Sequence, residues 1–208
     1  VQLYEEYPSR YSADVSRRHR WIRGDWQIAS WLLPRVPGPD ASHERNPLSG
    51  LSRWKIFDNL RRSLVPSALT LLLLLGWTVL SPLWFWTLAV IGTILIPPWI
   101  ASMMDLFQKP GDVLLRQHLA AAVRSAGRHF AQAAFTFACL PYETFFSLDA
   151  IVRTAGRLLV THKRLLEWSP SSEPDRKSRT DIAAFYRMMW IAPVLATAAM
   201  ISLKLSRQ

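Results

Sequence analysis

Arginine and tryptophan side chains recur at helical spacing near the start of the chain. On a helical wheel of about 100° per residue, one face holds Arg17, Trp21, Gly24, Ile28 and Trp31, and the adjacent face holds Arg20, Arg23 and Gln27. Guanidinium groups bind phosphate oxygens in bidentate fashion, and an indole gives a flat apolar surface on which a sugar ring can stack. These faces could therefore hold a nucleotide diphosphate next to a sugar. A basic helix that only anchors the chain at a membrane surface has the same composition, and the spacing alone does not separate the two.

The segment that carries these side chains is predicted to be helical over residues 12–33. Ser12 is a suitable N-cap, and Asp14 places a carboxylate in the first turn, where it interacts favourably with the helix dipole. Pro34 cannot continue a helix and is expected to end it.

Two long segments without charged residues follow, at residues 64–80 and 83–104. A helix needs about 20 apolar residues to cross a bilayer, so the second segment is long enough and the first is close to the lower limit. Because Ser81-Pro82 separates them, a membrane hairpin with a tight turn is expected over residues 64–104. Tryptophans fall near the expected helix ends, as in an aromatic belt: Trp77, Trp84, Trp86 and Trp99. A buried hairpin of a large soluble protein is the alternative.

A third membrane span is predicted near the end of the sequence, and prolines are expected to affect the shape of the second and third spans. Pro97-Pro98 is expected to bend or stop the second helix. A polar linker at residues 169–182 precedes a third predicted span at residues 183–205. Within that span Arg187 is close enough to the start to snorkel to the interface, and Pro193 is expected to kink the helix.

The basic residues are distributed unevenly along the chain. The 208 residues include 25 Lys+Arg against 15 Asp+Glu, a net charge of +10. Eleven Lys+Arg lie in residues 1–62 and eleven in residues 105–182, whereas the turn at 81–82 has none. Cytoplasmic segments next to membrane spans carry an excess of Lys and Arg, so both basic segments are expected in the cytoplasm, with anionic lipid headgroups as partners. Neither a basic groove nor a nucleic-acid-binding motif is visible, and nucleic acid is not an expected partner.

Residues 105–168 have the pattern of amphipathic helices that lie at a membrane surface. One helical stripe holds Arg153, Arg157 and Arg164. An apolar run from Phe130 to Leu140 is expected to end at Pro141. Ordinary helix packing in a cytosolic subdomain would give a similar pattern.

Four titratable residues in this region are candidates for chemistry. Glu143 and Asp149 could be catalytic, or they could be partners of nearby arginines. His118 and His129 could share a helix face, but eleven residues apart they are more typical of surface or core histidines than of metal ligands. No metal site is predicted from the histidines.

The composition excludes several classes of protein. Half of the residues are apolar, which is too many for a disordered chain. Cys139 is the only cysteine, so neither an intrachain disulfide nor a cysteine-based zinc site can form. The chain begins at Val1 without a targeting signal, and we expect it to be a piece of a longer protein.

Several sequence strings resemble known glycosyltransferases. The signature Q/R-x-x-R-W of membrane-embedded, family-2-like glycosyltransferases, which include cellulose and hyaluronan synthases, is matched at residues 17–21 (RRHRW). The chain further resembles the glycosyltransferase domain of cyclic β-1,2-glucan synthases. The matching strings are 4–10 (YEEYPSR), 18–27 (RHRWIRGDWQ), 46–49 (NPLS), 53–64 (RWKIFDNLRRSL), 140–144 (LPYET) and 161–168 (THKRLLEW).

This resemblance implies a very large enzyme of the bacterial inner membrane that transfers glucose from UDP-glucose to a growing β-1,2-glucan chain and cyclises it. By the same resemblance, Trp21 contacts the acceptor sugar, and Arg17 and Arg20 lie near the donor diphosphate. Arg17 stands where many relatives have Gln. Asp25 and Gln27 belong to the longer string and are included as candidate binding residues without an assigned role.

The resemblance also implies parts that this sequence does not contain. In the related enzymes a D-x-D motif holds the donor's metal, Mg²⁺ or Mn²⁺, and a separate carboxylate acts as base, both upstream of the Q/R-x-x-R-W helix. Nothing before Ser12 supplies a D-x-D motif. We therefore expect the metal ligands and the catalytic base to lie outside this chain, and the chain alone to be inactive.

The expected fold class is mainly α, following a truncated GT-A-like α/β catalytic domain. We expect the end of that domain at residues 1–35, a basic connector at 36–63, the membrane hairpin at 64–104, amphipathic helices at 105–168, a linker at 169–182 and a third span at 183–205. Two alternatives stay open: another membrane family-2-like polysaccharide synthase, and a non-catalytic membrane anchor or scaffold.

Overall fold

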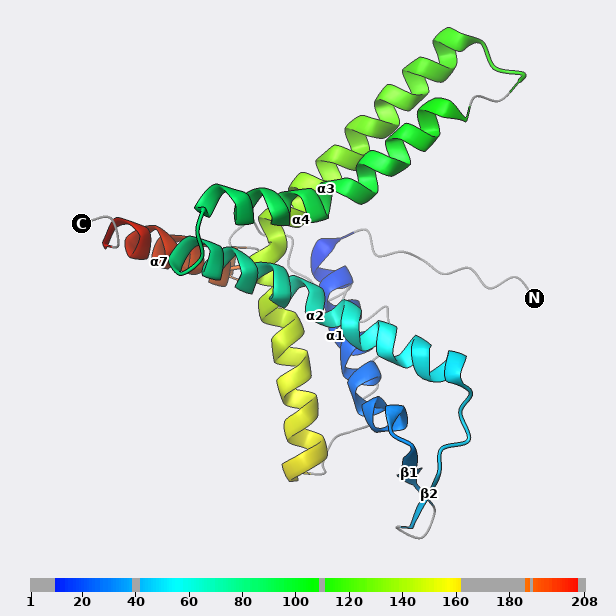
Figure 1. Ribbon diagram of the computed structural model, residues 1–208, viewed down its shortest axis with the longest axis vertical. Coiled ribbons are helices and arrows are strands. Elements are labelled where there is room, and N and C mark those ends of the chain that lie inside the picture. The colour runs from blue at the N-terminus through cyan, green and yellow to red at the C-terminus, as the bar shows by residue number, and fades with distance from the viewer. Residues whose placement is uncertain (1–9, 39–41, 109–110, 162–185, 188, 206–208) are drawn as a thin grey trace. The chain divides into compact units, whose positions relative to one another are not determined.

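The computed structural model describes residues 10–38, 42–108, 111–161, 186–187 and 189–205, and these are mainly helical, as predicted (Figure 1). The long helices are α1 (Tyr11–Gln27), α2 (Gly50–Thr78), α3 (Leu83–Phe107), α4 (Leu115–Gly156) and α7 (Ile191–Leu205). The chain forms two compact units, which are described separately. The first comprises residues 1–67 and 143–190, and the second comprises residues 68–142 and 191–208.

In the first unit, α1 has different ends from those predicted. Arg10, and not Ser12, occupies the N-cap position with an extended backbone. Ser12 lies inside the helix, where its carbonyl accepts a hydrogen bond from Ser16 Oγ at 3.0 Å. Asp14 lies in the first turn, as predicted. The helix ends at Gln27, well before Pro34, because the backbone tightens there into a 3₁₀ turn over Ala29–Leu32.

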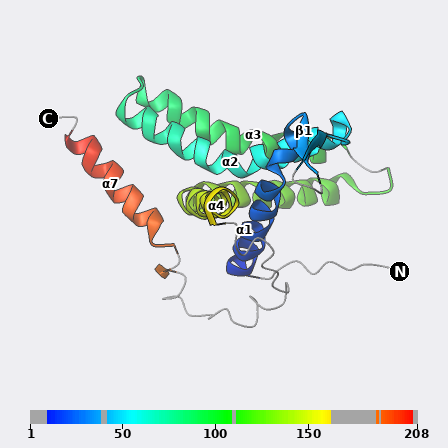
Figure 2. The same cartoon turned by 90° about the horizontal axis from the view of Figure 1, so that it is seen from below.

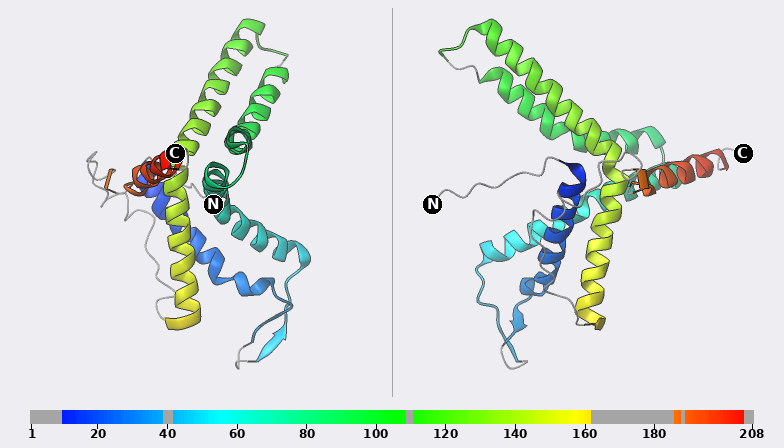
Figure 3. Two further views of the ribbon diagram at one scale, coloured as in Figure 1. Left: turned by 60° about the vertical axis from the view of Figure 1, so that its left-hand side comes forward. Right: turned by 180° about the vertical axis from the view of Figure 1, so that it is seen from behind.

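The apolar face of α1 packs within the first unit. Ala13, Val15 and Ile22 are buried. The C-terminal part of α4 lies beside α1 (Figure 3), and it contributes the buried residues Phe146, Ala150 and Ile151. The core of this unit is therefore formed by α1, the helix that carries the Q/R-x-x-R-W motif, and by the C-terminal part of α4, which is more than a hundred residues away in the sequence.

A short antiparallel hairpin that the sequence analysis did not predict follows α1. Its strands are β1 (Arg35–Pro37) and β2 (His43–Arg45), with Arg35 opposite Arg45. Just after β2, the Asn46 amide donates hydrogen bonds to the carbonyl oxygens of Trp31 and Leu33, at 2.6 and 2.8 Å. These bonds fix the hairpin against the end of the 3₁₀ turn.

Helix α2 begins long before the apolar segment that was predicted to span from residue 64. Its first turn is capped by Ser49, whose Oγ accepts a hydrogen bond from the backbone N–H of Ser52 at 3.2 Å. Arg53 Nη2 also donates to the carbonyl oxygen of Leu32 at 2.6 Å. Residues 50–63, placed in a basic connector from sequence, therefore form the first turns of this helix.

In the second unit, α2 and α3 lie side by side, as the helices of a hairpin do (Figure 2). Leu73, Val90 and Leu140 form its buried core. Trp77 Nε1 donates a hydrogen bond to Thr87 Oγ1 at 2.9 Å across the pair. The connection between the helices contains the Ser81-Pro82 peptide bond, which is cis.

Prolines lie inside α2, α3 and α4 without ending them. Helix α3 continues through Pro97-Pro98 to Phe107 and changes direction along its length, so the prolines bend the helix and do not stop it (Figure 1). One turn after the prolines, Ser102 Oγ donates to the carbonyl oxygen of Pro98 at 2.7 Å. Pro141 was expected to end the apolar run of residues 130–140, but it lies within the single helix α4.

Among the described residues, two helices are long and apolar enough to cross a membrane, α2 and α3, judged by length and composition. The third predicted span is described only in part. Helix α7 covers 15 residues of it, fewer than the roughly 20 that a bilayer needs, and residues 183–185 and 188 lie outside the described residues. The third span therefore stays a prediction, as does the linker at 169–182, which also lies outside them.

Candidate functional site

An open cleft of about 700 Å³ lies in the first unit, between α1 and α2. Helix α1 lines it with Arg18, Arg20, Trp21, Ile22, Gly24 and Asp25, helix α2 with Asn59, Arg62, Ser63 and Pro66, and α4 with Ser147. Three arginines and a single aspartate thus surround an exposed indole. A cleft of this composition attracts anions and offers a surface for stacking.

The ring of Trp21, which lines the cleft, packs against the guanidinium group of Arg17. The Cζ atom of Arg17 lies 4.8 Å from the ring centroid, within the range of a cation–π interaction. Arg17 Nη2 also donates to Asp14 Oδ1 at 2.9 Å, so this guanidinium lies between the indole and a carboxylate. Trp21 is 54% exposed, and it is therefore accessible to a ligand.

Asp25, Asn59 and Arg62 form a chain of hydrogen bonds between α1 and α2. Arg62 Nη2 donates to Asn59 Oδ1 at 2.6 Å, and Asn59 Nδ2 donates to Asp25 Oδ1 at 3.1 Å. Burial raises the pKa of Asp25, although the hydrogen bond from Asn59 and the charge of Arg62 both oppose this. A second link between the helices runs from Trp26 Nε1 to Ser63 Oγ at 3.0 Å.

Arg18 connects α1 to α4. Its Nη1 donates to Glu143 Oε1 at 2.8 Å, and its Cζ lies 5.2 Å from the ring centroid of Phe146. The Glu143 side chain is only 11% exposed. Burial acts to lower the pKa of Arg18, but the hydrogen bond and the charge of Glu143 outweigh it and raise the pKa. The Arg18 guanidinium is therefore charged at neutral pH.

His19, the next residue of α1, also contacts α4. Its Nε2 lies 3.0 Å from Asp149 Oδ2, and Arg153 Nε donates to Asp149 Oδ1 at 2.7 Å. Burial acts to raise the pKa of Asp149, but the hydrogen bonds from Arg153 and His19 hold it below its ordinary value. Asp149 thus pairs with a nearby arginine, as the second alternative expected, whereas Glu143 pairs with the distant Arg18.

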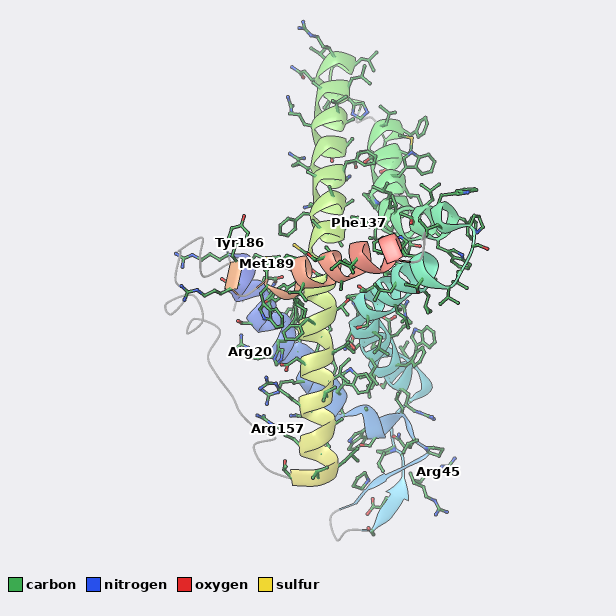
Figure 4. The ribbon with its side chains drawn as sticks, turned by 90° about the vertical axis from the view of Figure 1, so that its left-hand side faces the viewer. Arg20, Arg45, Phe137, Arg157, Tyr186 and Met189 are labelled. Atoms are coloured by element: carbon green, nitrogen blue, oxygen red, sulfur yellow. The ribbon has the colours of Figure 1, made fainter. Side chains whose placement is uncertain are left out.

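The structure brings three of the five sequence-predicted site residues into the cleft: Trp21, Arg20 and Asp25. Arg20 is labelled on α1 in Figure 4. Arg17 does not line the cleft and supports the Trp21 ring instead. Gln27 is the last residue of α1 and is likewise absent from the lining.

Sequence reasoning missed the residues that α2 contributes, above all Asn59 and Arg62. Both lie in the string at residues 53–64 that resembles glucan synthases, and this string was the available signal. Arg18 was also missed as a link to Glu143, because 125 positions separate the two residues. The predicted arginine stripe is described only in part. Arg153 lies in the last turn of α4, and Arg157 begins a π-helical turn over Arg157–Thr161 (Figure 4). Arg164 lies outside the described residues.

The two histidines of the second unit have partners on α3. His118 Nε2 lies 3.0 Å from the carbonyl oxygen of Leu106, and His129 Nδ1 lies 3.1 Å from Ser102 Oγ. Within the part of the chain that the structure describes, no three His, Cys, Asp or Glu residues lie together as metal ligands would. These residues therefore do not fit a divalent metal site.

Comparison with known proteins supports the resemblance read from the motifs. No protein-family profile matches the chain. The chain is 34% identical over 202 residues to cyclic β-(1,2)-glucan synthase NdvB of Rhizobium meliloti (strain 1021), and the match covers 96% of this chain. It spans only 7% of the length of that protein. Similarity over almost the whole chain thus relates this sequence to one short section of a cyclic β-(1,2)-glucan synthase.

Proposed function

We propose that this chain is part of a membrane-bound glucosyltransferase that polymerises glucose from UDP-glucose into β-1,2-glucan. Its contribution would be the cleft between α1 and α2, which would hold the acceptor end of the glucan and part of the donor diphosphate. The similarity to a cyclic β-(1,2)-glucan synthase over almost the whole chain supports the reaction. The single observation that carries the role of the cleft is the exposed Trp21 indole beside Arg20 in one lining.

The roles of individual residues follow from their chemistry. The Trp21 ring is exposed, apolar and braced by Arg17, so it would stack against the acceptor sugar. Arg20 and Arg62 approach the cleft from two helices, and their guanidinium groups would bind phosphate oxygens from two sides. Such charges stabilise the diphosphate as it leaves the sugar.

The donor's metal is no part of this cleft. We propose that Mg²⁺ or Mn²⁺ accompanies the diphosphate and is held by residues outside the chain, since the described residues do not form a metal site. The catalytic base would also be supplied from elsewhere in the synthase. On this proposal the chain alone transfers no glucose.

Helices α2 and α3 would hold the cleft at the membrane. Both are apolar and long enough to cross it, and the basic residues before and after them would face anionic headgroups on the cytoplasmic side. The site would then lie at the inner surface of a bacterial inner membrane, where UDP-glucose is available.

The alternative of a plain membrane anchor predicts a different response to mutation. An anchor needs only charge and apolar surface, so Arg20→Lys and Trp21→Leu would have little effect. A binding site needs the planar guanidinium and the indole, and either change would impair it. The structure favours the site, because Asn59 and Arg62 of a second helix complete the same cleft.

The experiment that tests this proposal uses membranes that contain the full-length protein. Labelled UDP-glucose is supplied with Mg²⁺ or Mn²⁺, and the linkage of the labelled polymer is determined. Trp21→Ala is compared with Trp54→Ala at equal protein levels. Trp54 is a matched control, because this residue of α2 is 61% exposed and does not line the cleft.

We expect wild type and Trp54→Ala to form β-1,2-linked glucan at similar rates. Trp21→Ala should be slower by about tenfold or more, as expected for the loss of about 1.4 kcal/mol of stacking in the transition state. Equal rates for the two variants would contradict the acceptor site. A polymer with another linkage would point to a different polysaccharide synthase.

A further inference from the structure

Two consecutive residues of α1, Arg18 and His19, are held by α4, and Arg18 also lines the cleft. Arg18 pairs with Glu143, and His19 contacts Asp149. Arg20 and Trp21 follow directly in the sequence. Both contacts lie within the first unit of the chain.

We propose that Glu143 and Asp149 of α4 are positioning residues of the synthase. They fix the rotation and the height of α1, so that Arg20 and Trp21 present their side chains to the cleft. This inference rests on the proposed function and adds the element that sets the geometry of its site.

The geometry of the two contacts explains why they would control the orientation of α1. Consecutive residues of a helix point about 100° apart, so holding both Arg18 and His19 prevents rotation about the helix axis. Their partners Glu143 and Asp149 are six positions apart on α4, which is roughly 9 Å along that helix. Two separated contact points also resist sliding of α1 along α4.

The contact between Arg18 and Glu143 is buried enough to fix the position of both side chains. The Glu143 side chain is 11% exposed and the Arg18 side chain 32% exposed, with the Phe146 ring packed against the guanidinium. In the Arg61–Asp58 pair, by contrast, the Arg61 side chain is 57% exposed and can rearrange in water, so the geometry of that pair contributes little. Glu143 has no such freedom, and therefore its carboxylate defines one place for Arg18.

The second contact is fixed from the other side by a further cation. Arg153 Nε binds Asp149 Oδ1 one helical turn later in α4, which leaves Oδ2 directed to His19. The carboxylate thus has both oxygens occupied and one orientation. A small displacement of α1 would move Trp21 relative to the sugar, and misplacement of about 1 Å can reduce a rate about a hundredfold.

The test uses Glu143→Gln and Asp149→Asn in the full-length protein, singly and together. These variants keep the size of each side chain and remove its charge, and neither residue lines the cleft. Asp112→Asn is the matched control, because Asp112 is exposed in the turn before α4. For each variant, kcat and KM for UDP-glucose, the protein level in membranes and the Tm in detergent are measured.

We expect each single variant to lower kcat about tenfold, with a smaller change in KM and with Tm within a few degrees of wild type. The double variant should be slower than either single variant. Glu143→Asp, which keeps the charge on a shorter side chain, should recover part of the activity lost in Glu143→Gln. A purely structural role would instead lower the protein level and Tm, with kcat per folded molecule unchanged.

The outcomes separate this inference from the proposed function. If Trp21→Ala abolishes synthesis while Glu143→Gln and Asp149→Asn have normal kcat, the positioning role is wrong and the acceptor site stands. If Trp21→Ala has normal activity, the site is wrong and the positioning role is wrong with it. If kcat falls in the variants only in proportion to folded protein, the two carboxylates only stabilise the fold.

Discussion

Asp25 is the one acidic side chain in the lining of a cleft that otherwise attracts anions. Burial raises its pKa, so the folded state binds the proton more tightly than the unfolded state. The ionised carboxylate therefore opposes folding at neutral pH, and the stability of the protein should increase as the pH falls through this raised pKa. An asparagine at position 25 has no charge to bury and can still accept the hydrogen bond from Asn59.

We therefore expect Asp25→Asn to raise Tm slightly at pH 7, and the difference from wild type to shrink as the pH is lowered. Thermal unfolding of the detergent-solubilised protein between pH 4 and pH 8 checks this, with Asp112→Asn as the exposed control. A lower Tm for Asp25→Asn across this range would show that the charge of Asp25 stabilises the fold.

Asp149 is expected to behave in the opposite way. Its pKa is held below the ordinary value by Arg153 and His19 against the effect of burial, so its charge stabilises the folded state. This contribution is complete above the unfolded pKa of about 4 and is lost as the pH falls through the lower folded pKa. Asp149→Asn should cost about 1 kcal/mol at pH 7, since hydrogen bonds to partly exposed charged groups are worth about that much.

Urea unfolding of wild type and Asp149→Asn at pH 7 and at pH 3.5 measures this difference. The two proteins should differ at pH 7 and become more similar at pH 3.5. A difference that grows on acidification would mean that the pKa of Asp149 is raised and not lowered.

Residues of the site could be predicted from the sequence where they lie close together on one helix. Trp21, Arg20 and Asp25 lie in one short helical segment, and all three line the cleft. Asn59, Arg62 and Glu143 come from distant segments whose approach depends on how the helices pack. Helical periodicity reports which residues share a face but not which other helix covers that face.

At the scale of elements, the pairing of α2 with α3 depends on a glycine. A Cβ atom added at Gly76 would lie 2.5 Å from Trp86 Cβ, closer than two such atoms can approach. Gly76→Ala should therefore separate the helices and cost about 1–3 kcal/mol, the usual penalty for overpacking. Trp77 and Thr87, which are hydrogen-bonded across the same pair, would be displaced with it.

Gly92→Ala in α3 is the matched control, because a Cβ atom there would meet nothing within 4 Å. Alanine is the better helix former by about 1 kcal/mol, so this variant should be neutral or more stable. Thermal unfolding in detergent compares the two substitutions. Equal Tm values for Gly76→Ala and Gly92→Ala would show that the two helices do not approach closely at Gly76.

Helices were predicted correctly as elements, but their ends were not. The charge-free segments predicted α2 and α3 and the turn between them. The prolines did not mark the helix ends, since α1 ends at Gln27, well before Pro34, and α4 continues through Pro141. The start of α2 at Gly50 depends on the Ser49 cap and on the Arg53 contact with the 3₁₀ turn, and the second of these is a tertiary contact.

At the scale of the whole molecule, charge distribution predicts how the chain would cross a membrane. The predicted hairpin has basic segments on both sides and a turn at residues 81–82 without Lys or Arg. Both helices of the hairpin are long enough to span. The positive-inside rule then places the turn on the far side of the membrane and the loop between α3 and α4 in the cytoplasm.

Cysteine labelling in bacterial spheroplasts tests this orientation with the full-length protein. Ser81→Cys and Asp112→Cys each add a thiol at an exposed position, one at either end of α3. A helix of 25 residues is roughly 37 Å long, so the two thiols should lie on opposite sides of a hydrocarbon core about 30 Å thick. Labelling of the parent protein, in which Cys139 is buried, gives the background.

A membrane-impermeant maleimide should label Ser81→Cys in intact spheroplasts, whereas Asp112→Cys should react only after lysis. The reverse pattern would contradict the predicted orientation but would still show that α3 crosses the membrane. Equal labelling of both thiols in intact spheroplasts would mean that α3 does not cross the membrane. In that case the cleft could still bind a sugar and a diphosphate, because its lining comes entirely from the first unit, but the hairpin would no longer explain how it is held at the membrane.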